Sequence, residues 1–327
     1  MPELHAVAHK MIEKGKGILA ADESTPTCTK RFESIGTKST AESRNIYRNM
    51  LFTAEKIEKY ISGVILFDET FHQKELSTGL TFPEYLTSKG ILPGIKVDQG
   101  LEDFGSNEKV TKGLDGLSER LGKYYAMGAR FAKWRAVITI GNNIPSDDCI
   151  IKNAEILAKY AQKCQQANLV PIVEPEVLMD GAHTVDESFD VTSRALNATF
   201  DQLVEHNVNL QGIVLKPNMI LSGYECSYQA NIEEVAEKTI NCLSANVPIE
   251  IPGIAFLSGG QPDEHATLHL NEMNKYDSDW NLTFSFGRAL QQTALKAWSG
   301  KPENLKLAQE VFIEKAKANS LASVAGL

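Results

Sequence analysis

The sequence predicts an α/β fold, a TIM (β/α)8 barrel built as a single domain over residues 1–327. Short apolar runs rich in β-branched residues recur about every 30 to 45 residues, and helix-forming stretches separate them. No Gly/Ser-rich linker or change of composition divides the chain. The expected strands are GILAAD from residue 17, ISGVILFDE from 61, PGIKVD from 93, ARFAKWRAV from 129, VPIVEPEV from 170, LQGIVLKPN from 210, IPGIAFLSGG from 251 and LTFSFGRAL from 282.

The stretches between these runs carry helix signals. Ser39 and Glu42 have the spacing of a capping box, and Asn231 with Glu234 marks a second helix start. Residues at helical spacing form a stripe in three places: Leu114, Leu117, Leu121 and Tyr124; Ala154, Leu157, Ala161 and Cys164; and Ile232, Val235, Ala236, Thr239, Ile240 and Leu243. A doubly wound sheet is the alternative fold, but it normally has a glycine-rich phosphate loop after an early strand, and GxGxxG is absent.

Composition restricts the kind of protein. The chain has 327 residues, 43% of them hydrophobic, with a formal charge of −9, so nucleic-acid or anionic-membrane partners are not expected. An anionic substrate must therefore be held by a local basic pocket. The N-terminus has no apolar signal region, no run is long enough to span a membrane, and the five cysteines show no CxxC pairing. These features predict a soluble, cytoplasmic protein.

Polar residues lie toward the carboxyl end of most of the expected strands. Active sites of such barrels form at this end, and the strand period of two places residues i and i+2 on the same face. We therefore expect these side chains to converge in the barrel mouth. They are Asp22, Lys96, Asp98, Lys133, Arg135, Glu174, Glu176, Lys216, Ser258 and Arg288.

Convergence of lysines with carboxylates favours Schiff-base chemistry. A lysine amine attacks a ketone only when neutral, and a neighbouring cation or desolvation lowers a lysine pKa; Lys133 and Lys216 are expected to act on each other in this way. An acid must then remove water from the carbinolamine. Either Glu174 or Glu176 fits, because one of two neighbouring carboxylates tends to keep its proton. Asp22 is a candidate for a separate base that starts carbon–carbon cleavage.

Two glycine-containing stretches predict a phosphate site. Ser258-Gly259-Gly260 follows the seventh expected strand, and Gly287-Arg288 follows the eighth. The corresponding loops of TIM barrels frequently bind phosphate through backbone amides and a helix N-terminus, and an arginine adds a bidentate donor.

A metal site is the competing interpretation of His265 and His269. Their i, i+4 spacing suits helical zinc ligands, but no Glu follows His265, so the HExxH motif is not present. We expect both histidines on a solvated helix face and no metal in the site.

Beyond these residues, the chain resembles class I fructose-1,6-bisphosphate aldolases along nearly its whole length. The matching segments are GILAADES (17–24), GVILFDET (63–70), GIKVD (94–98), GLDGLSER (113–120), FAKWR (131–135), VPIVEPE (170–176), LKPNM (215–219), FLSGGQ (256–261), GRALQ (287–291) and ALKAW (294–298).

The resemblance implies a role for each matched position. Lys216 matches the Schiff-base lysine, Glu174 the acid/base that dehydrates the carbinolamine, and Asp22 the base at the C4 hydroxyl, with Lys133 and Glu176 in support. Residues matching one phosphate site are Ser258, Gly259, Gly260, Ser285, Gly287 and Arg288. Ser24, Arg31 and Lys96 match the other end of the substrate, to which Arg135 is a further candidate. The resemblance also implies a homotetramer that uses no metal or other cofactor and works in glycolysis and gluconeogenesis.

Three departures from the family pattern bear on this expectation. Pro26 and Thr27 replace a glycine and a phosphate-contacting serine, so a hydroxyl survives in a loop whose shape is open. Gln99 replaces a lysine, and the chain ends at Leu327 where the family has a longer tail ending in tyrosine. Two alternatives to fructose-bisphosphate cleavage therefore stay open, namely similar chemistry on another phosphorylated sugar and a non-enzymatic scaffold.

Overall fold

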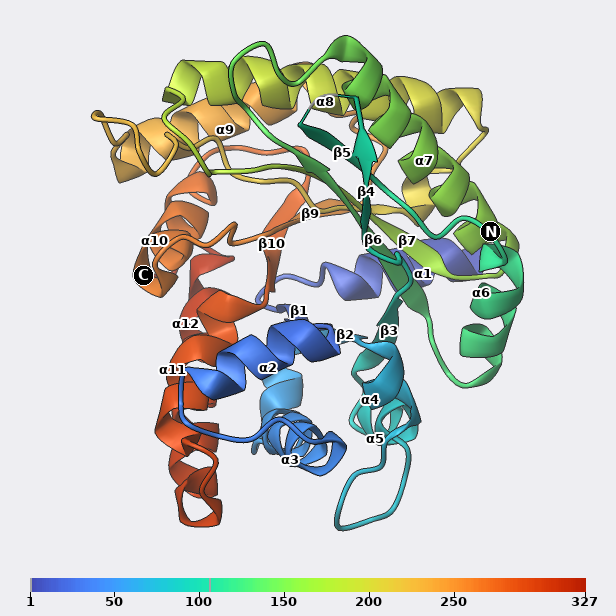
Figure 1. The fold of residues 1–327 in the computed structure, drawn as a ribbon, viewed down its shortest axis with the longest axis vertical. Helices are drawn as coiled ribbons and strands as arrows, with labels where there is room; N and C mark the ends of the chain where they lie inside the picture. The colour runs from blue at the N-terminus through green and yellow to red at the C-terminus, as the bar shows by residue number, and fades with distance from the viewer. Residues whose placement is uncertain (1, 106) are drawn as a thin grey trace.

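The computed structural model describes residues 2–105 and 107–327, and eight parallel strands in it close into a barrel. The strand order around the barrel is β1-β10-β9-β8-β7-β6-β3-β2. Helices surround this barrel (Figure 1), so the predicted (β/α)8 fold class is confirmed. The barrel strands are β1 (Gly17–Ala21), β2 (Ile61–Leu66), β3 (Leu92–Lys96), β6 (Phe131–Ile138), β7 (Val170–Val177), β8 (Val214–Leu215), β9 (Gly253–Phe256) and β10 (Asn281–Phe286).

Most of the helices lie between successive strands and cover the outside of the barrel, whereas the first helix precedes β1 and the last two follow β10. They are α1 (Pro2–Met11), α2 (Thr25–Glu33), α3 (Ala41–Phe52), α4 (Asp68–His72), α5 (Phe82–Ser88), α6 (Leu117–Ala126), α7 (Asp147–Gln166), α8 (Val185–Glu205), α9 (Ile232–Asn246), α10 (Asp263–Met273), α11 (Arg288–Trp298) and α12 (Leu305–Ala322). Short 3-10 turns occur at Ile57–Lys59, Leu210–Gly212 and Pro302–Asn304. No helix among the described residues is both long and apolar enough to cross a membrane.

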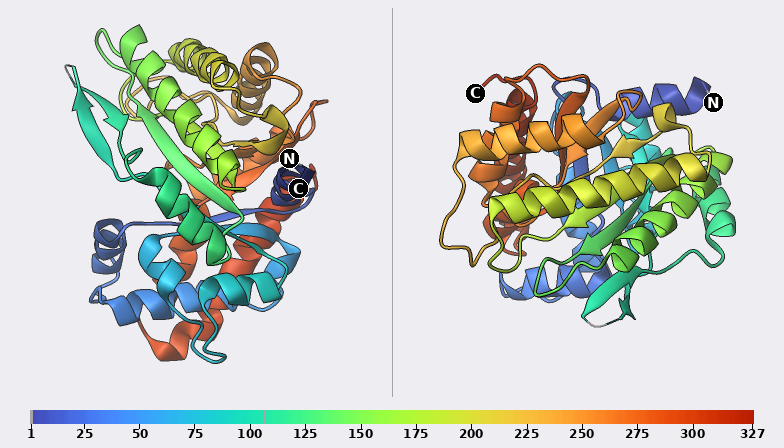
Figure 2. Two further views of the ribbon diagram at one scale, coloured as in Figure 1. Left: turned by 90° about the vertical axis from the view of Figure 1, so that its right-hand side faces the viewer. Right: turned by 90° about the horizontal axis from the view of Figure 1, so that it is seen from above.

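Two elements were not expected from the sequence. Strands β4 (Leu101–Phe104) and β5 (Glu108–Thr111) form an antiparallel hairpin between the third and fourth barrel strands, which projects from the body of the molecule (Figure 2).

Strand β8 has only two residues. Pairing with β7 continues for one more residue, because the Lys216 amide still donates to the Val173 carbonyl at 2.8 Å. Pro217 follows and has no N–H to extend the ladder.

The two largest hydrophobic clusters among the described residues follow from strand alternation. Residues on the inner strand faces, such as Ile18, Ile65, Phe131 and Ile172, fill the barrel interior. Helix α1 packs Leu4 and other apolar residues against this interior cluster. The outer strand faces pack against the helices in a larger cluster.

The helix starts were predicted in part. Asn231 caps α9, since its side chain accepts the Glu234 amide at 2.9 Å. The predicted box of Ser39 and Glu42 is wrong, because Thr40 accepts the Ser43 amide at 3.0 Å and Ser43 accepts the Thr40 amide in return. Threonine at the N-cap and serine at N3 satisfy the same two amide groups as the usual Ser/Glu pair, so the box begins one residue later.

Candidate active site

One cavity of about 900 Å3 opens at the carboxyl ends of the barrel strands. All of the residues predicted for the site line it. Those predicted for catalysis are Asp22, Lys133, Glu174, Glu176 and Lys216, and those predicted for substrate binding are Ser24, Thr27, Arg31, Lys96, Arg135, Ser258, Gly259, Gly260, Ser285, Gly287 and Arg288.

Strand alternation brings them together. On β7, Val170 and Ile172 fill the barrel interior, and the next two residues on the same face are Glu174 and Glu176. Lys133 is the third of eight residues in β6, so the expectation that it lies late in its strand is wrong. The inner face therefore changes from apolar to charged partway along the strands, where the apolar plug ends and the cavity begins.

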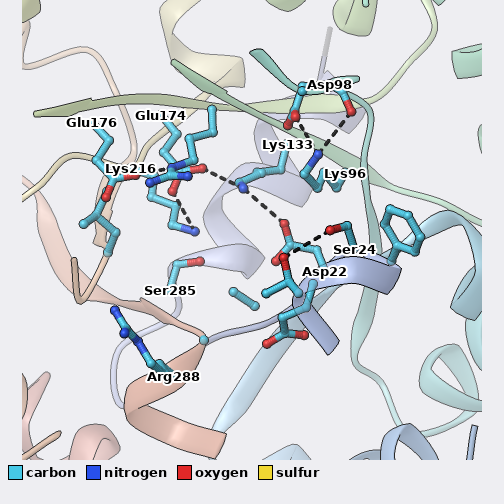
Figure 3. A pocket seen from close by; sticks show the side chains of 18 of the residues that line it. Asp22, Ser24, Lys96, Asp98, Lys133, Glu174, Glu176, Lys216, Ser285 and Arg288 are labelled. Atoms are coloured by element: carbon cyan, nitrogen blue, oxygen red, sulfur yellow. Dashed lines mark hydrogen bonds and ion pairs between the residues drawn. The ribbon is translucent and has the colours of Figure 1, made fainter. Parts of the chain in front are cut away.

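Four charged side chains form a continuous line across the cavity floor (Figure 3). The Nζ of Lys216 lies 3.1 Å from Oε1 of Glu174, and the Nζ of Lys133 lies 3.0 Å from Oε2 of the same carboxylate. Lys133 also donates to Oδ2 of Asp22 at 3.1 Å. Lys216, Glu174 and Lys133 are at most 5% exposed. The line thus alternates in charge and is almost wholly removed from water.

These contacts set the charge of the carboxylates. Burial raises the pKa of Asp22 and of Glu174, but the nearby lysines, Lys133 foremost and then Lys216, lower both values further than burial raises them. The pKa of Lys133 is raised, because Asp22 and Glu174 outweigh the desolvation of its ammonium group. The expectation that the two lysines lower each other's pKa is therefore wrong for Lys133, which stays a cation between two anions.

Glu176 has a different partner. It forms an ion pair with Nε of Arg135, which comes from the neighbouring strand β6. Because Glu174 pairs with the lysines and Glu176 with Arg135, each carboxylate has its own cation. The expectation that one of the two keeps its proton is wrong for Glu174, whose pKa is lowered.

The loop after β1 and the start of α2 form one side of the cavity. Ser24 is the N-cap residue of α2, and its Oγ lies 3.1 Å from Oγ1 of Thr27. Pro26 occupies the first turn of α2, where its missing N–H leaves no helical hydrogen bond unmade. The departures from the family pattern at residues 26 and 27 therefore keep a regular helix with two hydroxyl groups at its start.

Glu23 was missed by the sequence interpretation. Its carboxylate forms ion pairs with Arg31 on α2 and with Arg48 on α3. It also accepts a hydrogen bond of 2.9 Å from Nε2 of Gln291 on α11. Both Arg48 and Gln291 are buried. Glu23 thereby joins three helices directly beside Asp22. Two features of the sequence could have indicated this role: the carboxylate of Glu23 directly after Asp22 at a strand end, and Arg48 among apolar residues of α3.

The loops after β9 and β10 form the opposite side of the cavity. Gly259 and Gly260 have φ values of +59° and +92°, which favour glycine. A Cβ at Gly260 would lie 2.5 Å from Nη2 of Arg288, so the guanidinium lies directly over this glycine. Arg288 also begins α11, and a helix N-terminus has unpaired amides and a partial positive charge that favour an anion. The Oγ of Ser285 is buried here without a partner among the described residues.

The two histidines of α10 differ from expectation. His265 is exposed, but His269 is buried, and its Nδ1 lies 2.7 Å from Oε1 of Gln261. The prediction that His269 lies on a solvated helix face is therefore wrong, since α10 turns this side chain toward the loop after β9. Within residues 2–105 and 107–327, no cluster of three or more His, Cys, Asp or Glu side chains is arranged to hold a metal.

Known proteins match this chain along its whole length. The family model described as class-I fructose-bisphosphate aldolase matches residues 3–326. A probable class 1 fructose-bisphosphate aldolase of Xanthomonas axonopodis pv. citri is 52% identical, over 98% of this chain and 97% of its own. The cytosolic fructose-bisphosphate aldolase 4 of Arabidopsis thaliana is 50% identical, over 99% of this chain and 83% of its own.

A solved structure agrees with the sequence relatives. The fructose-bisphosphate aldolase of Plasmodium falciparum, solved in complex with TRAP and a small-molecule inhibitor, superposes with a TM-score of 0.97 at 47% identity. The match covers 99% of this chain and 95% of that one. With the barrel and the lysine–carboxylate line already described, these matches show that the chain belongs to the class I fructose-bisphosphate aldolase family, a family of lyases.

Proposed function

We propose that this protein cleaves fructose 1,6-bisphosphate reversibly to dihydroxyacetone phosphate and glyceraldehyde 3-phosphate, through a Schiff base on Lys216. The observation that carries the proposal is the 3.1 Å contact between Nζ of Lys216 and Oε1 of Glu174, both buried in the barrel mouth. A buried amine beside an ionised carboxylate has the proton acceptor that it needs to become a nucleophile.

The first stage is Schiff-base formation. Glu174 starts as a carboxylate and takes a proton from the Lys216 ammonium, and the neutral amine then attacks the C2 ketone. A second proton moves from the attached nitrogen to the former ketone oxygen, which gives the neutral carbinolamine. Glu174 returns the proton to the hydroxyl of the carbinolamine, which leaves as water. The products are a positively charged iminium and the original carboxylate, so protons and charge balance. The lowered pKa of Glu174 keeps it in the carboxylate form with which this sequence starts.

The second stage is cleavage. Asp22 takes the proton of the C4 hydroxyl, the C3–C4 bond breaks, and its electron pair moves into the iminium to give an enamine and the aldehyde product. Lys133 holds Asp22 and Glu174 ionised and in position through its contacts of 3.1 Å and 3.0 Å. Protonation of the enamine and hydrolysis then release the ketone product and free Lys216.

Two cationic regions receive the two phosphates. The ketone-bearing half lies against Ser258, Gly259, Gly260, Ser285, Gly287 and Arg288. The aldehyde-bearing half lies toward Ser24, Thr27, Arg31 and Lys96, with Arg135 as a further contributor at this end. Support for this assignment is that both groups line the same cavity, on either side of the lysine–carboxylate line. Charge-assisted hydrogen bonds at both ends select a bisphosphate.

The wider setting is part of the same proposal. The protein works as a single (β/α)8 domain, forms a homotetramer, and acts in the cytoplasm in glycolysis and gluconeogenesis. Support comes from the family match, which includes a relative named as cytosolic in Arabidopsis thaliana. Light scattering tests the assembly, since a mass near that of one chain contradicts the tetramer.

A cleavage assay tests the proposed reaction. The 1,6-bisphosphate and the 1-monophosphate of fructose are supplied separately, each with and without EDTA. We expect faster cleavage of the bisphosphate and no effect of the chelator. Activity that is lost with EDTA and restored by zinc contradicts the metal-free mechanism, and cleavage of neither ketose contradicts the proposed substrate class.

A further inference from the structure

We propose that Asp98 is a positioning residue that holds Lys96 ready for the phosphate on the aldehyde-bearing half of the substrate. The Nζ of Lys96 lies 2.5 Å from Oδ1 of Asp98 and 3.1 Å from its backbone carbonyl oxygen (Figure 3). The inference rests on the proposed function, because Lys96 is assigned to that phosphate there. It adds a residue that contacts the ligand only through another side chain.

The backbone around Asp98 is held on both sides. The Val97 amide donates to the Lys133 carbonyl at 3.1 Å, and the Gln99 amide donates to the Lys112 carbonyl at 2.8 Å. These bonds tie the end of β3 to β6 and to the strand pair β4–β5. The acceptors that Asp98 presents to Lys96 are therefore fixed in place, and the unexpected hairpin has a function in fixing them.

Burial strengthens the contact. The side chain of Asp98 is 6% exposed and that of Lys96 is 19% exposed. An ion pair so far removed from water is screened less than one on the surface, so the ammonium stays where the carboxylate holds it. A free lysine loses side-chain entropy when it is ordered. Ordering Lys96 before the ligand arrives removes that cost from binding.

The contact also leaves capacity for a ligand. A lysine ammonium has three N–H groups, and Asp98 accepts two of them, so one remains for a phosphate oxygen. The Oδ2 of Asp98 is buried and has no partner among the described residues. Lys96 can therefore turn toward a ligand and exchange Oδ1 for Oδ2 without leaving the carboxylate.

A third consequence concerns Asp22. Lys96 is among the cations that lower the pKa of Asp22, after Lys133 and Lys216. Asp98 gives Lys96 a carboxylate partner of its own, separate from Asp22. Asp98 thus keeps Lys96 directed to the phosphate region rather than onto the proposed base.

The experiment compares two substrates that differ only in the second phosphate. The kcat/KM for fructose 1,6-bisphosphate is divided by that for fructose 1-phosphate, in the wild type and in Asp98→Ala, Asp98→Asn and Lys96→Met. We expect this ratio to fall about hundredfold in Lys96→Met and about tenfold in Asp98→Ala, because a hydrogen bond to a charged group is lost or misplaced. Asp98→Asn keeps an acceptor oxygen without the charge and gives an intermediate fall.

Two further measurements make the result specific. Asp98→Ala introduced into Lys96→Met should lower the ratio no further, since Asp98 acts through Lys96. The matched control is Asp103→Asn, since Asp103 is an exposed carboxylate paired with Lys109 on the hairpin. This substitution should leave the ratio unchanged. Asp98→Asn preserves the shape of the side chain, so it answers the question if Asp98→Ala does not fold.

The outcomes separate the two proposals. A ratio that falls in Lys96→Met but stays at the wild-type value in both Asp98 variants overturns the positioning role alone. A ratio that rises in the Asp98 variants also overturns it, because Asp98 then competes with the phosphate. An unchanged ratio in Lys96→Met overturns both the positioning role and the assignment of Lys96 to a phosphate.

Discussion

The Nζ of Lys133 lies 3.0 Å from Oε2 of Glu174, the oxygen of that carboxylate that Lys216 does not contact. The two residues come from the adjacent strands β6 and β7, which pair in parallel. Glu174 is thereby held between two ammonium groups, and its pKa is lowered even though it is buried. The mechanism depends on this arrangement, since it keeps Glu174 in the carboxylate form with which Schiff-base formation starts.

Replacing Lys133 tests the arrangement. Lys133→Met removes the cation from between Asp22 and Glu174, so the pKa of each carboxyl rises and one becomes protonated more readily. We expect kcat to fall by about 10²-fold or more, because a preorganised charge in a buried site is lost. Steady-state kinetics measures the fall. A kcat within a few fold of the wild type means that Lys133 has no part in the reaction.

The sequence predicts the barrel and the position of these groups well, for a physical reason. Apolar residues at every second position, followed by charged residues on the same face, determine both the inner core and the cavity above it. What the sequence does not provide is the pairing of the charges. That Glu174 pairs with Lys133 and Lys216, while Glu176 pairs with Arg135, depends on strand register and side-chain reach.

A second substitution tests the phosphate region at β9 and β10. Arg288→Ala removes a guanidinium that lies over Gly260, and each charge-assisted hydrogen bond contributes about 1.5–3 kcal/mol. We expect binding of the bisphosphate and of dihydroxyacetone phosphate to weaken by about ten- to a hundredfold, while borohydride trapping at saturating ligand persists.

The control for Arg288 is an arginine outside the cavity. Arg194 on α8 pairs with the exposed Asp147, and Arg194→Ala should leave ligand affinity at the wild-type value. Titration calorimetry with dihydroxyacetone phosphate compares the variants. Equal affinity of Arg288→Ala and the wild type places the phosphate elsewhere.

Stability should depend on pH through His269. Burial, with a smaller effect of His265, lowers the pKa of His269 from 6.5 to about 4. Between these values the unfolded chain binds a proton that the folded protein does not. The buried neutral state of His269 therefore leaves the fold at its full stability above pH 6.5. The free energy of unfolding decreases as the pH falls from 6.5 toward 4, because protons then favour the unfolded chain.

Denaturant unfolding between pH 4 and 8 measures this dependence. His269→Asn should reduce the loss of stability on acidification, and His9→Asn, at an exposed position on α1, should not. Identical pH slopes for His269→Asn and the wild type contradict a buried neutral His269. The sequence could not predict this state, because the turn of α10 toward Gln261 is set by packing and not by the i, i+4 spacing.

A pair of glycines tests the packing of the barrel interior. A Cβ at Gly94 in β3 would lie 2.1 Å from the ring of Phe131, whereas one at Gly122 in α6 meets nothing within 4 Å. Gly94→Ala should lower the free energy of unfolding by about 1–3 kcal/mol, because the core has no room to expand. Gly122→Ala should raise it by about 0.5–1 kcal/mol, since alanine is the better helix former. Equal effects of the two changes contradict the close packing described at Phe131.

The most direct test of the mechanism is to locate the covalent adduct. The protein is reduced with borohydride in the presence of dihydroxyacetone phosphate, digested, and mapped by mass spectrometry, with Lys216→Arg treated in parallel. We expect one adduct, on Lys216, that is unaffected by EDTA and absent from Lys216→Arg. An adduct on Lys133 or another lysine, or no adduct from a protein that cleaves the bisphosphate, contradicts the assignment of Lys216 as the nucleophile.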